Sequence, residues 1–207
     1  MVTGSGSPVG CGGMKQYVRP GGPVRPVRAD EWRQVKELRL SALKDPVAHL
    51  AFLETYERAA AAPDSVWRER AESAAAGTRV RQFVTEGPDG TWSGTVTVRL
   101  EEPGSADMFG GTVSRRQAHL VGVFVRPECR GSGVIDTLFD AALTWAWSLA
   151  GVSRARLYVH EDNARAERFY RRFGFVPSGQ TVPMKGDPAK VEREMILGPP
   201  GASPGRS

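Results

Sequence analysis

Hydrophobic and polar residues follow two periods between about residues 24 and 197. Apolar residues that alternate or run together predict strands, and apolar residues three or four positions apart predict helices. Strands are predicted at 24–29, 79–86, 92–102, 118–125, 155–159, 173–176 and 190–197. Helices are predicted at 29–43 with Asp30 as N-cap, at 47–75 with a break at Pro63, at 134–150, and from Asn163 to about Gly174. This order predicts an α/β (α+β) fold, in which helices pack on a mixed sheet.

The two ends of the chain lack this patterning. Residues 1–23 and 198–207 are rich in Gly, Ser and Pro, so they have little apolar surface to bury. We therefore expect disordered tails at 1–23 and 198–207 on either side of one domain at 24–197. A domain of this length can build a sizeable core.

Composition narrows the class of protein further. No apolar run approaches the roughly 20 residues that span a bilayer, and the first residues lack the layout of a secretory signal. The positions of the two cysteines, Cys11 and Cys129, do not predict a disulfide framework of the kind found in small secreted domains. We expect a cytoplasmic protein with no membrane partner.

The formal net charge of +5 is compatible with any polyanionic ligand. Most basic residues are scattered among acidic ones rather than gathered into a stripe, which disfavours nucleic acid as a partner. The best support for nucleic-acid binding is the arginine cluster at 165–172, but a solvated helix face is the more common origin of such a cluster. We expect no nucleic-acid partner.

Small residues occupy the junction between the apolar strand at 118–125 and the helix at 134–150. Gly131, Ser132 and Gly133 leave the backbone uncovered where the helix begins, and Arg130 adds a positive charge beside them. The first amides of a helix have no partners within the helix, and its dipole is positive at this end. The pattern predicts an anion site of the phosphate type. It is neither a Walker A loop nor a dinucleotide fingerprint.

A second motif follows one strand later, in "NARAERFYRRFGF" at 163–175. Asn163 can cap the short helix, and Tyr170 lies seven residues further on. Seven residues are about two turns, so both side chains lie on the same side of the helix. Considered alone, Tyr170 is an ordinary core aromatic. Its spacing after an anion-binding helix start favours a functional role.

Together, the segments 119–133, 163–175 and 191–197 resemble the GCN5-related N-acetyltransferase (GNAT) superfamily. The family motif Arg/Gln-x-x-Gly-x-Gly/Ala falls on Arg130, Gly133 and Ile135, where Ile135 departs from the expected small residue. The resemblance implies a largely antiparallel mixed sheet with a splayed central strand pair and helices on both faces. It also implies acetyl-CoA as acyl donor, no metal, and a monomer or homodimer.

The resemblance assigns roles to residues of the two motifs. Strand backbone would pair with the pantetheine arm, amides of the glycine junction would hold the pyrophosphate, and Tyr170 would face the thioester sulfur as the acid. The implied cofactor contacts are Val123, Phe124, Val125, Arg130, Gly131, Ser132, Gly133, Val134, Ile135, Asp136 and Asn163. Coenzyme A is itself polyanionic, which suits the net positive charge.

The predicted function is transfer of an acetyl group to a primary amine, with a small molecule as the favoured acceptor. Protein N-terminal acetyltransferases of the ribosomal type carry a glutamate base where this chain has Tyr158, which disfavours a protein acceptor. A protein N-terminal or lysine acetyltransferase stays open as an alternative, as does a non-catalytic acyl-CoA-binding module. We expect the acceptor side to be segment 40–57, with Asp45, Glu54 and Glu57 as candidate cation contacts.

Several residues are candidates for the general base. His160 ends one strand beside the expected splay, and His119 begins the neighbouring strand. A neutral imidazole near pH 7 can accept the ammonium proton directly or through water. Glu86 and Glu161 stay open as further candidates.

Overall fold

A sheet of seven strands forms the centre of the computed structural model, which describes residues 22–87, 89–184 and 187–201. The predicted tails, 1–23 and 198–207, lie largely outside these residues. The strands are β1 (Val24–Pro26), β2 (Val80–Glu86), β3 (Trp92–Glu101), β4 (Gln117–Val125), β5 (Ala155–His160), β6 (Val176–Met184) and β7 (Asp187–Leu197). The helices are α1 (Trp32–Leu43), α2 (Tyr56–Ala61), α3 (Asp64–Ala76), α4 (Val134–Trp147) and α5 (Ala164–Arg172), with short 3-10 helices η1 (Ala48–Leu50) and η2 (Pro127–Cys129).

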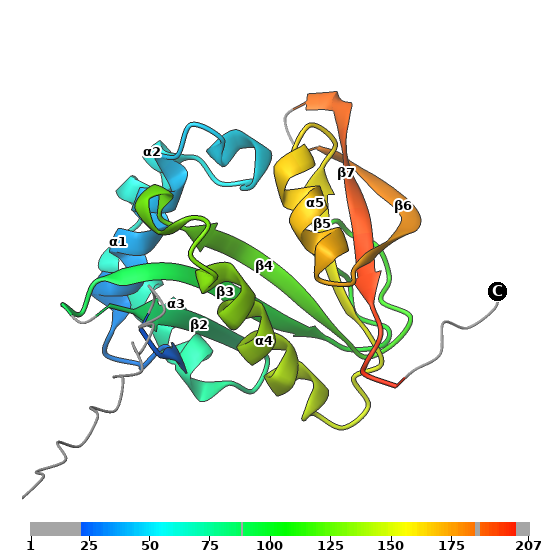
Figure 1. Cartoon of the computed structure of the whole chain (residues 1–207), viewed down its shortest axis with the longest axis horizontal. Helices are drawn as coiled ribbons and strands as arrows, with labels where there is room; N and C mark the ends of the chain where they lie inside the picture. The colour runs from blue at the N-terminus through cyan, green and yellow to red at the C-terminus, as the bar shows by residue number, and fades with distance from the viewer. Residues whose placement is uncertain (1–21, 88, 185–186, 202–207) are drawn as a thin grey trace, which may run out of the picture.

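The strands lie in the order β1-β2-β3-β4-β5-β7-β6, and every neighbouring pair is antiparallel except β4 and β5. Helices cover both faces of the sheet, as predicted (Figure 1). Side chains of consecutive strand residues point to opposite faces. Phe83 therefore packs in the cluster with Leu138 of α4, while Val84 packs in the cluster with Trp67 of α3. Burial of each such side chain stabilises the folded protein by about 1.5–3 kcal/mol relative to leaving it exposed to water.

The central strands β4 and β5 separate almost as soon as they meet. They pair only at Ala118 with Ala155 and at His119 with Arg156, and β4 then continues to Val125. A bulge in β4 at Gly122, where φ is +62°, bends the strand within this unpaired stretch. The β5 side of β4 therefore presents backbone N–H and C=O groups that no strand covers. The splay divides the sheet into a β1–β4 limb and a β5–β7 limb (Figure 1).

The N-terminal helices differ from the prediction in their boundaries. Helix α1 begins at Trp32 with Glu31 at the cap position, because the Glu31 carboxylate accepts the Arg28 amide at 2.8 Å and binds Arg25. The predicted helical region at 47–75 is three pieces, η1, α2 and α3. Thr55 caps α2 by accepting the amide of Arg58, and α3 begins directly after Pro63.

The C-terminal strands also differ from the prediction. The expected strand at 173–176 is mainly the turn that follows α5, because Gly174, with φ +104°, turns the chain sharply after the helix ends at Arg172. Strand β6 begins at Val176 and pairs with β7, so the hairpin is longer than the apolar pattern indicates. Polar residues and prolines in 176–184 obscure the strand in the sequence. Among the described residues, no helix is long and apolar enough to cross a bilayer.

Candidate functional site

Two cavities meet where β4 and β5 separate. The larger cavity has a volume of about 710 Å³ and is lined mainly by α1, α3, β2, β3, β4 and the segment at 50–54. The smaller cavity has a volume of about 370 Å³ and lies between the end of β4, the start of α4 and α5. The residues that line both cavities are Ala51, Phe52, Val123, Asn163, Ala166 and Tyr170. Molecules bound in the two cavities would therefore meet at these six residues.

The smaller cavity gathers ten of the eleven residues predicted to contact the cofactor. They are Val123, Phe124, Val125, Arg130, Gly131, Gly133, Val134, Ile135, Asp136 and Asn163. The exception is Ser132, whose hydroxyl donates to the Cys129 carbonyl at 2.6 Å and so stabilises the turn rather than lining the cavity. Residues as far as 40 positions apart in sequence, Val123 and Asn163, thus converge as the predicted motifs require.

The start of α4 is built to receive an anion. Gly131 and Gly133 have φ of +79° and +87°, a left-handed conformation that favours glycine. Within the described part of the chain, a Cβ at either position would meet no atom within 4 Å, so the space beside the loop is open. No side chain of residues 22–87, 89–184 or 187–201 caps α4, which leaves its first amides free to bind a phosphate.

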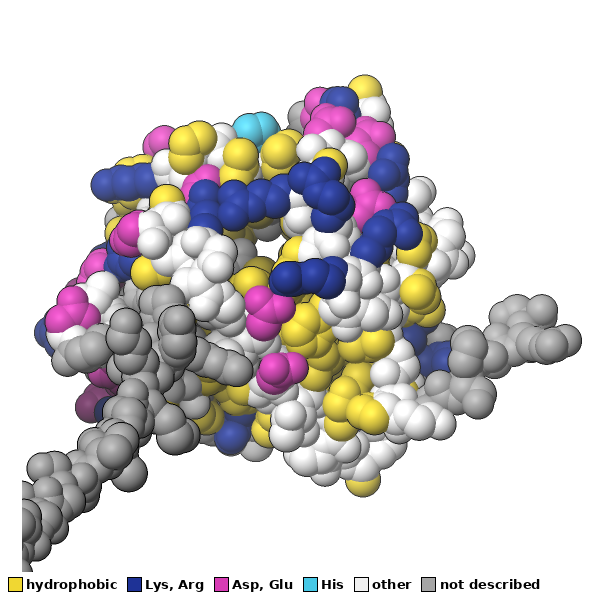
Figure 2. Space-filling model, viewed as in Figure 1, with side chains coloured by type: hydrophobic (Ala, Val, Ile, Leu, Met, Phe, Trp, Pro, Cys, Tyr) yellow, Lys and Arg dark blue, Asp and Glu magenta, His cyan; other side chains and the backbone are white. Residues whose placement is uncertain are grey.

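Positive charge surrounds this helix start. Arg130, Arg165 and Arg172 all line the smaller cavity, and Arg172 also pairs with Asp136 at 2.9 Å. Figure 2 shows a hollow on the face that carries α4 and α5, with basic side chains gathered beside it. The site therefore combines helix amides with guanidinium groups, the usual means of binding a phosphate.

Arg130 is held in place by two contacts. Its Nε donates to the Val125 carbonyl at 3.1 Å, and its guanidinium forms an ion pair with the buried carboxylate of Asp45. Asp45 belongs to the segment predicted to face the acceptor, but it lines the smaller cavity instead. The ion pair fixes the loop after α1 against the anion-binding loop.

The predicted cap and tyrosine of α5 lie at the junction of the cavities. The Asn163 side chain accepts the Ala166 amide at 3.2 Å, which confirms its role as N-cap. The Tyr170 ring packs against Phe139, Phe169 and Phe175, and only 8% of its surface is exposed. Burial raises the pKa of the phenol, so it stays protonated at neutral pH. Among the described residues, no group forms a hydrogen bond with this hydroxyl.

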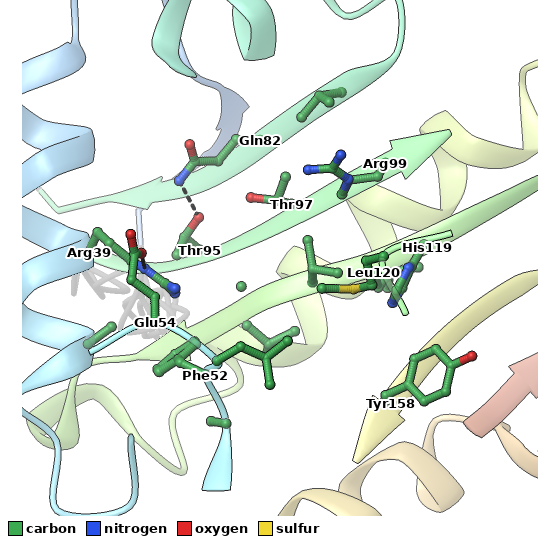
Figure 3. Close-up of a pocket in the computed structure, with 18 of the residues that line it drawn as sticks. Arg39, Phe52, Glu54, Gln82, Thr95, Thr97, Arg99, His119, Leu120 and Tyr158 are labelled. Carbon is green, nitrogen blue, oxygen red and sulfur yellow. Dashed lines mark hydrogen bonds and ion pairs between the residues drawn. The ribbon is translucent and has the colours of Figure 1, made fainter. Parts of the chain in front are cut away.

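Polar side chains of β2 and β3 form the floor of the larger cavity. Thr95, Thr97 and Arg99 project in a row from β3, and Gln82 of β2 donates to the Thr95 hydroxyl at 3.0 Å (Figure 3). Phe52 and the segment around it form the wall opposite the floor. The floor offers hydrogen bonds, while the wall offers apolar contact.

His119 also lines the larger cavity, at the closed end of the splay. Its Nδ1 lies 3.0 Å from the Glu101 carboxylate, and Arg156 binds the same carboxylate at 2.8 Å. Burial lowers the pKa of His119, although Glu101 partly opposes this, so the imidazole is neutral at pH 7. Burial would raise the pKa of Glu101, but the hydrogen bonds from His119 and Arg156 outweigh it and lower the pKa to about 2.

Tyr158, which stands in place of the glutamate base of ribosomal-type enzymes, faces the larger cavity (Figure 3). Its hydroxyl accepts a hydrogen bond from Arg156 at 2.9 Å. Burial raises the pKa of Tyr158 to about 12, so this phenol cannot act as a base near pH 7.

The other predicted base candidates lie away from both cavities. His160 is buried, and its Nδ1 accepts the Asp162 amide at 3.1 Å. Glu161 accepts the Val191 amide at 3.2 Å, and Glu86 pairs with Arg25 at 2.6 Å. None of the three lines either cavity. The geometry does not favour them, and their role as base stays an untested prediction.

Glu192 of β7 is a candidate that the sequence patterns did not single out. It lines the larger cavity, is half-buried, and pairs in register with His160 of β5. No described cation or hydrogen-bond donor contacts its carboxylate, so burial raises its pKa. The alternation of Glu192 and Glu194 just before the apolar end of β7 is the only signal in the sequence that could have indicated it.

Comparison with known proteins gives a consistent family match. Residues 32–175 match the sequence model of the Acetyltransferase (GNAT) family. A putative acetyltransferase from Salmonella typhimurium, solved with its cofactor acetyl-CoA, superposes with a TM-score of 0.63 at 16% identity. The superposition covers 89% of this chain and 98% of that one, which shows that the fold is shared.

Two curated relatives are similar over part of their length. A mycothiol acetyltransferase from Brachybacterium faecium is 33% identical over 97 residues, or 47% of this chain and 27% of the relative. A spermidine N(1)-acetyltransferase from Vibrio cholerae is 30% identical over 78 residues, or 36% of this chain and 45% of the relative. The matches thus span less than half the length of either relative.

Proposed function

We propose that this chain, which belongs to the acetyltransferase (GNAT) family, transfers an acetyl group from acetyl-CoA to a primary amine of a small molecule. The observation that carries the proposal is the meeting of the two cavities at Tyr170. An acyl donor in the smaller cavity and an amine in the larger one would have their reacting groups side by side. Positioning of this kind can contribute roughly 7–11 kcal/mol of barrier reduction.

The smaller cavity suits coenzyme A in shape and charge. The open glycine loop and the uncapped start of α4 would hold the pyrophosphate, with Arg130, Arg165 and Arg172 nearby. The uncovered backbone of β4 after the bulge would pair with the amides of the pantetheine arm. These contacts would direct the thioester toward the splay and Tyr170.

Acetyl transfer forms a C–N bond and breaks a C–S bond, so the amine must lose a proton and the departing thiolate must gain one. Tyr170 is a candidate to supply the second proton, because it lines both cavities and its hydroxyl has no partner among the described residues. Burial keeps this phenol protonated until the thiolate forms.

Glu192 is the group best placed to accept the proton from the amine. It is a cavity carboxylate with no counter-ion among the described residues, so an incoming ammonium group would be attracted to it. A carboxyl group whose pKa is raised by burial is also a stronger base than an exposed one. His119 is the alternative, but protonating it would place a positive charge beside Arg156.

A small-molecule acceptor is supported by the size of the larger cavity. Its volume of about 710 Å³ lies within the range of ligand pockets, and the segment at 50–54 closes one side. Both curated relatives carry the names of acetyltransferases for small molecules, mycothiol and spermidine.

Calorimetry with acetyl-CoA, followed by a thiol-release assay over a panel of primary amines, tests the proposal. We expect acetyl-CoA to bind and to raise the melting temperature, because a ligand that binds only the folded state stabilises it. At least one amine should release thiol faster than water alone. Absence of acetyl-CoA binding would contradict the proposal, as would binding without amine-dependent release across the panel.

A further inference from the structure

The larger cavity contains an arginine that no acidic residue neutralises. Arg99 projects from β3 and is exposed, and among the described residues no carboxylate pairs with it. In the sheet it lies between Val80 of β2 and His119 of β4. Figure 3 shows it at the end of the row that begins with Thr95 and Thr97.

The remaining charges of the larger cavity do not balance this arginine. Arg39 and Arg70 share one carboxylate, that of Glu54, at 3.0 and 3.2 Å. Arg58 lines the cavity with no acidic partner among the described residues. The charged groups of the lining are Arg39, Arg58, Arg70 and Arg99 against Glu54, Glu69 and Glu192. Positive charge therefore exceeds negative charge, even though the expected acceptor is an amine.

We infer that the acceptor carries a carboxylate in addition to its amine, and that Arg99 binds this carboxylate while Glu192 receives the amine. The inference rests on the proposed function and specifies its acceptor class. Arginine suits this role because its planar guanidinium can donate two parallel hydrogen bonds to a carboxylate. The Thr97 hydroxyl beside it is available to complete the contact.

The positions of the two groups support an acceptor with opposite charges at its ends. Arg99 lies on the β1–β4 limb, in register with His119 at the closed end of the splay. Glu192 lies on the β5–β7 limb, in register with the last residue of β5, from which the chain leads into α5. A polyamine would instead bring several ammonium groups against the four arginines, an arrangement that Coulomb repulsion disfavours.

Matched acceptors that differ only in charge test the inference. Amino acids with the amine at increasing distance from the carboxylate are compared with their carboxamides, in the wild type and in Arg99→Gln. A charge-assisted hydrogen bond is worth about 1.5–3 kcal/mol, which corresponds to roughly a 10- to 100-fold preference in kcat/KM for the carboxylate. Arg99→Gln should lose this preference mainly through KM. Arg115→Gln, the control, removes an exposed arginine outside both cavities and should retain the preference for the carboxylate.

Two further experiments distinguish the possible outcomes. Aminoalkyl phosphates paired with their amino alcohols show whether phosphate replaces carboxylate, and a preference for phosphate over carboxylate would overturn the assignment. Calorimetric titration of the same compounds into CoA-saturated protein measures binding without turnover. Equal kcat/KM for carboxylates and carboxamides would overturn the inference, as would a carboxylate preference that persists in Arg99→Gln. In either case, amine-dependent thiol release would still uphold the proposed function. Carboxylate-selective, Arg99-dependent binding without thiol release would uphold the inference and contradict the proposed function.

Discussion

The Nδ1 atom of His119 lies 3.0 Å from a carboxylate oxygen of Glu101, and both side chains are buried. The Glu101 carboxylate also binds Arg156 of β5, so one acidic group joins the strands on both sides of the splay. Asp107 and Glu194 complete the set of carboxylates around Arg156. This buried network holds β4 and β5 together at the end where their backbones still pair.

Glu101→Gln should lower the free energy of unfolding by about 1.5–3 kcal/mol at pH 7, because it removes charge-assisted hydrogen bonds from a buried site. The pKa of Glu101 is about 2 in the folded protein, below its value of about 4.3 when unfolded. The stabilisation is therefore complete above pH 4.3 and declines as the pH falls toward 2. Urea denaturation at pH 7 and pH 3 should show the gap between wild type and variant narrowing at pH 3.

The neighbouring Glu102→Gln is the control for that comparison. Glu102 pairs with Arg116 at an exposed position, so its removal should cost less than about 1 kcal/mol. Equal losses in the two variants would show that the buried network is not what stabilises the splay.

Tyr170→Phe should lower kcat by roughly 10²- to 10⁴-fold, the usual contribution of a general acid, and leave acetyl-CoA binding and stability nearly unchanged. The phenyl ring keeps its contacts with Phe139 and Phe175 but cannot donate a proton. Steady-state kinetics separate the outcomes, since a rise confined to KM would identify Tyr170 as a binding residue. Full activity would leave it as a core aromatic only.

Gly133→Ala should weaken acetyl-CoA binding by about tenfold or more, because alanine disfavours the left-handed backbone that exposes the first amides of α4. Calorimetry measures the loss. Gly104→Ala is a matched control, since Gly104 has φ +80° and open space around it but lies outside both cavities. Equal affinity in the two variants would contradict the assignment of the pyrophosphate site.

Glu192→Gln should remove one ionisation from the acidic limb of the pH profile of kcat/KM. A base acts only when deprotonated, so wild-type activity should rise as the pH increases through the raised pKa of Glu192. The variant should lose roughly 10²- to 10⁴-fold in kcat. Its pH profile should keep only the rise in kcat/KM that comes from deprotonation of the amine substrate. Glu69→Gln, in the same cavity, should keep the full profile. A full acidic limb in Glu192→Gln would point to His119.

The smaller cavity was predictable because its residues belong to short local motifs. The glycine junction lies within four residues of Arg130, and Tyr170 follows Asn163 by two helical turns, so spacing alone places these groups together. The larger cavity depends on pairing between distant strands. Glu192 reaches it through the register of β7 with β5, and Glu101 meets Arg156 across 55 positions of sequence. No local pattern encodes those contacts.

The two cavities are built from separate stretches of chain apart from the six residues at their junction. Helices α1 and α3 and strands β2 and β3 line only the larger cavity, whereas α4 lines only the smaller one. The cavity-facing residues in 35–39, 67–82 and 95–99 therefore form a wall that α4 and the anion-binding loop do not share. Descendants of this chain could exchange one acceptor for another through changes in that half of the domain, while donor recognition is inherited unchanged.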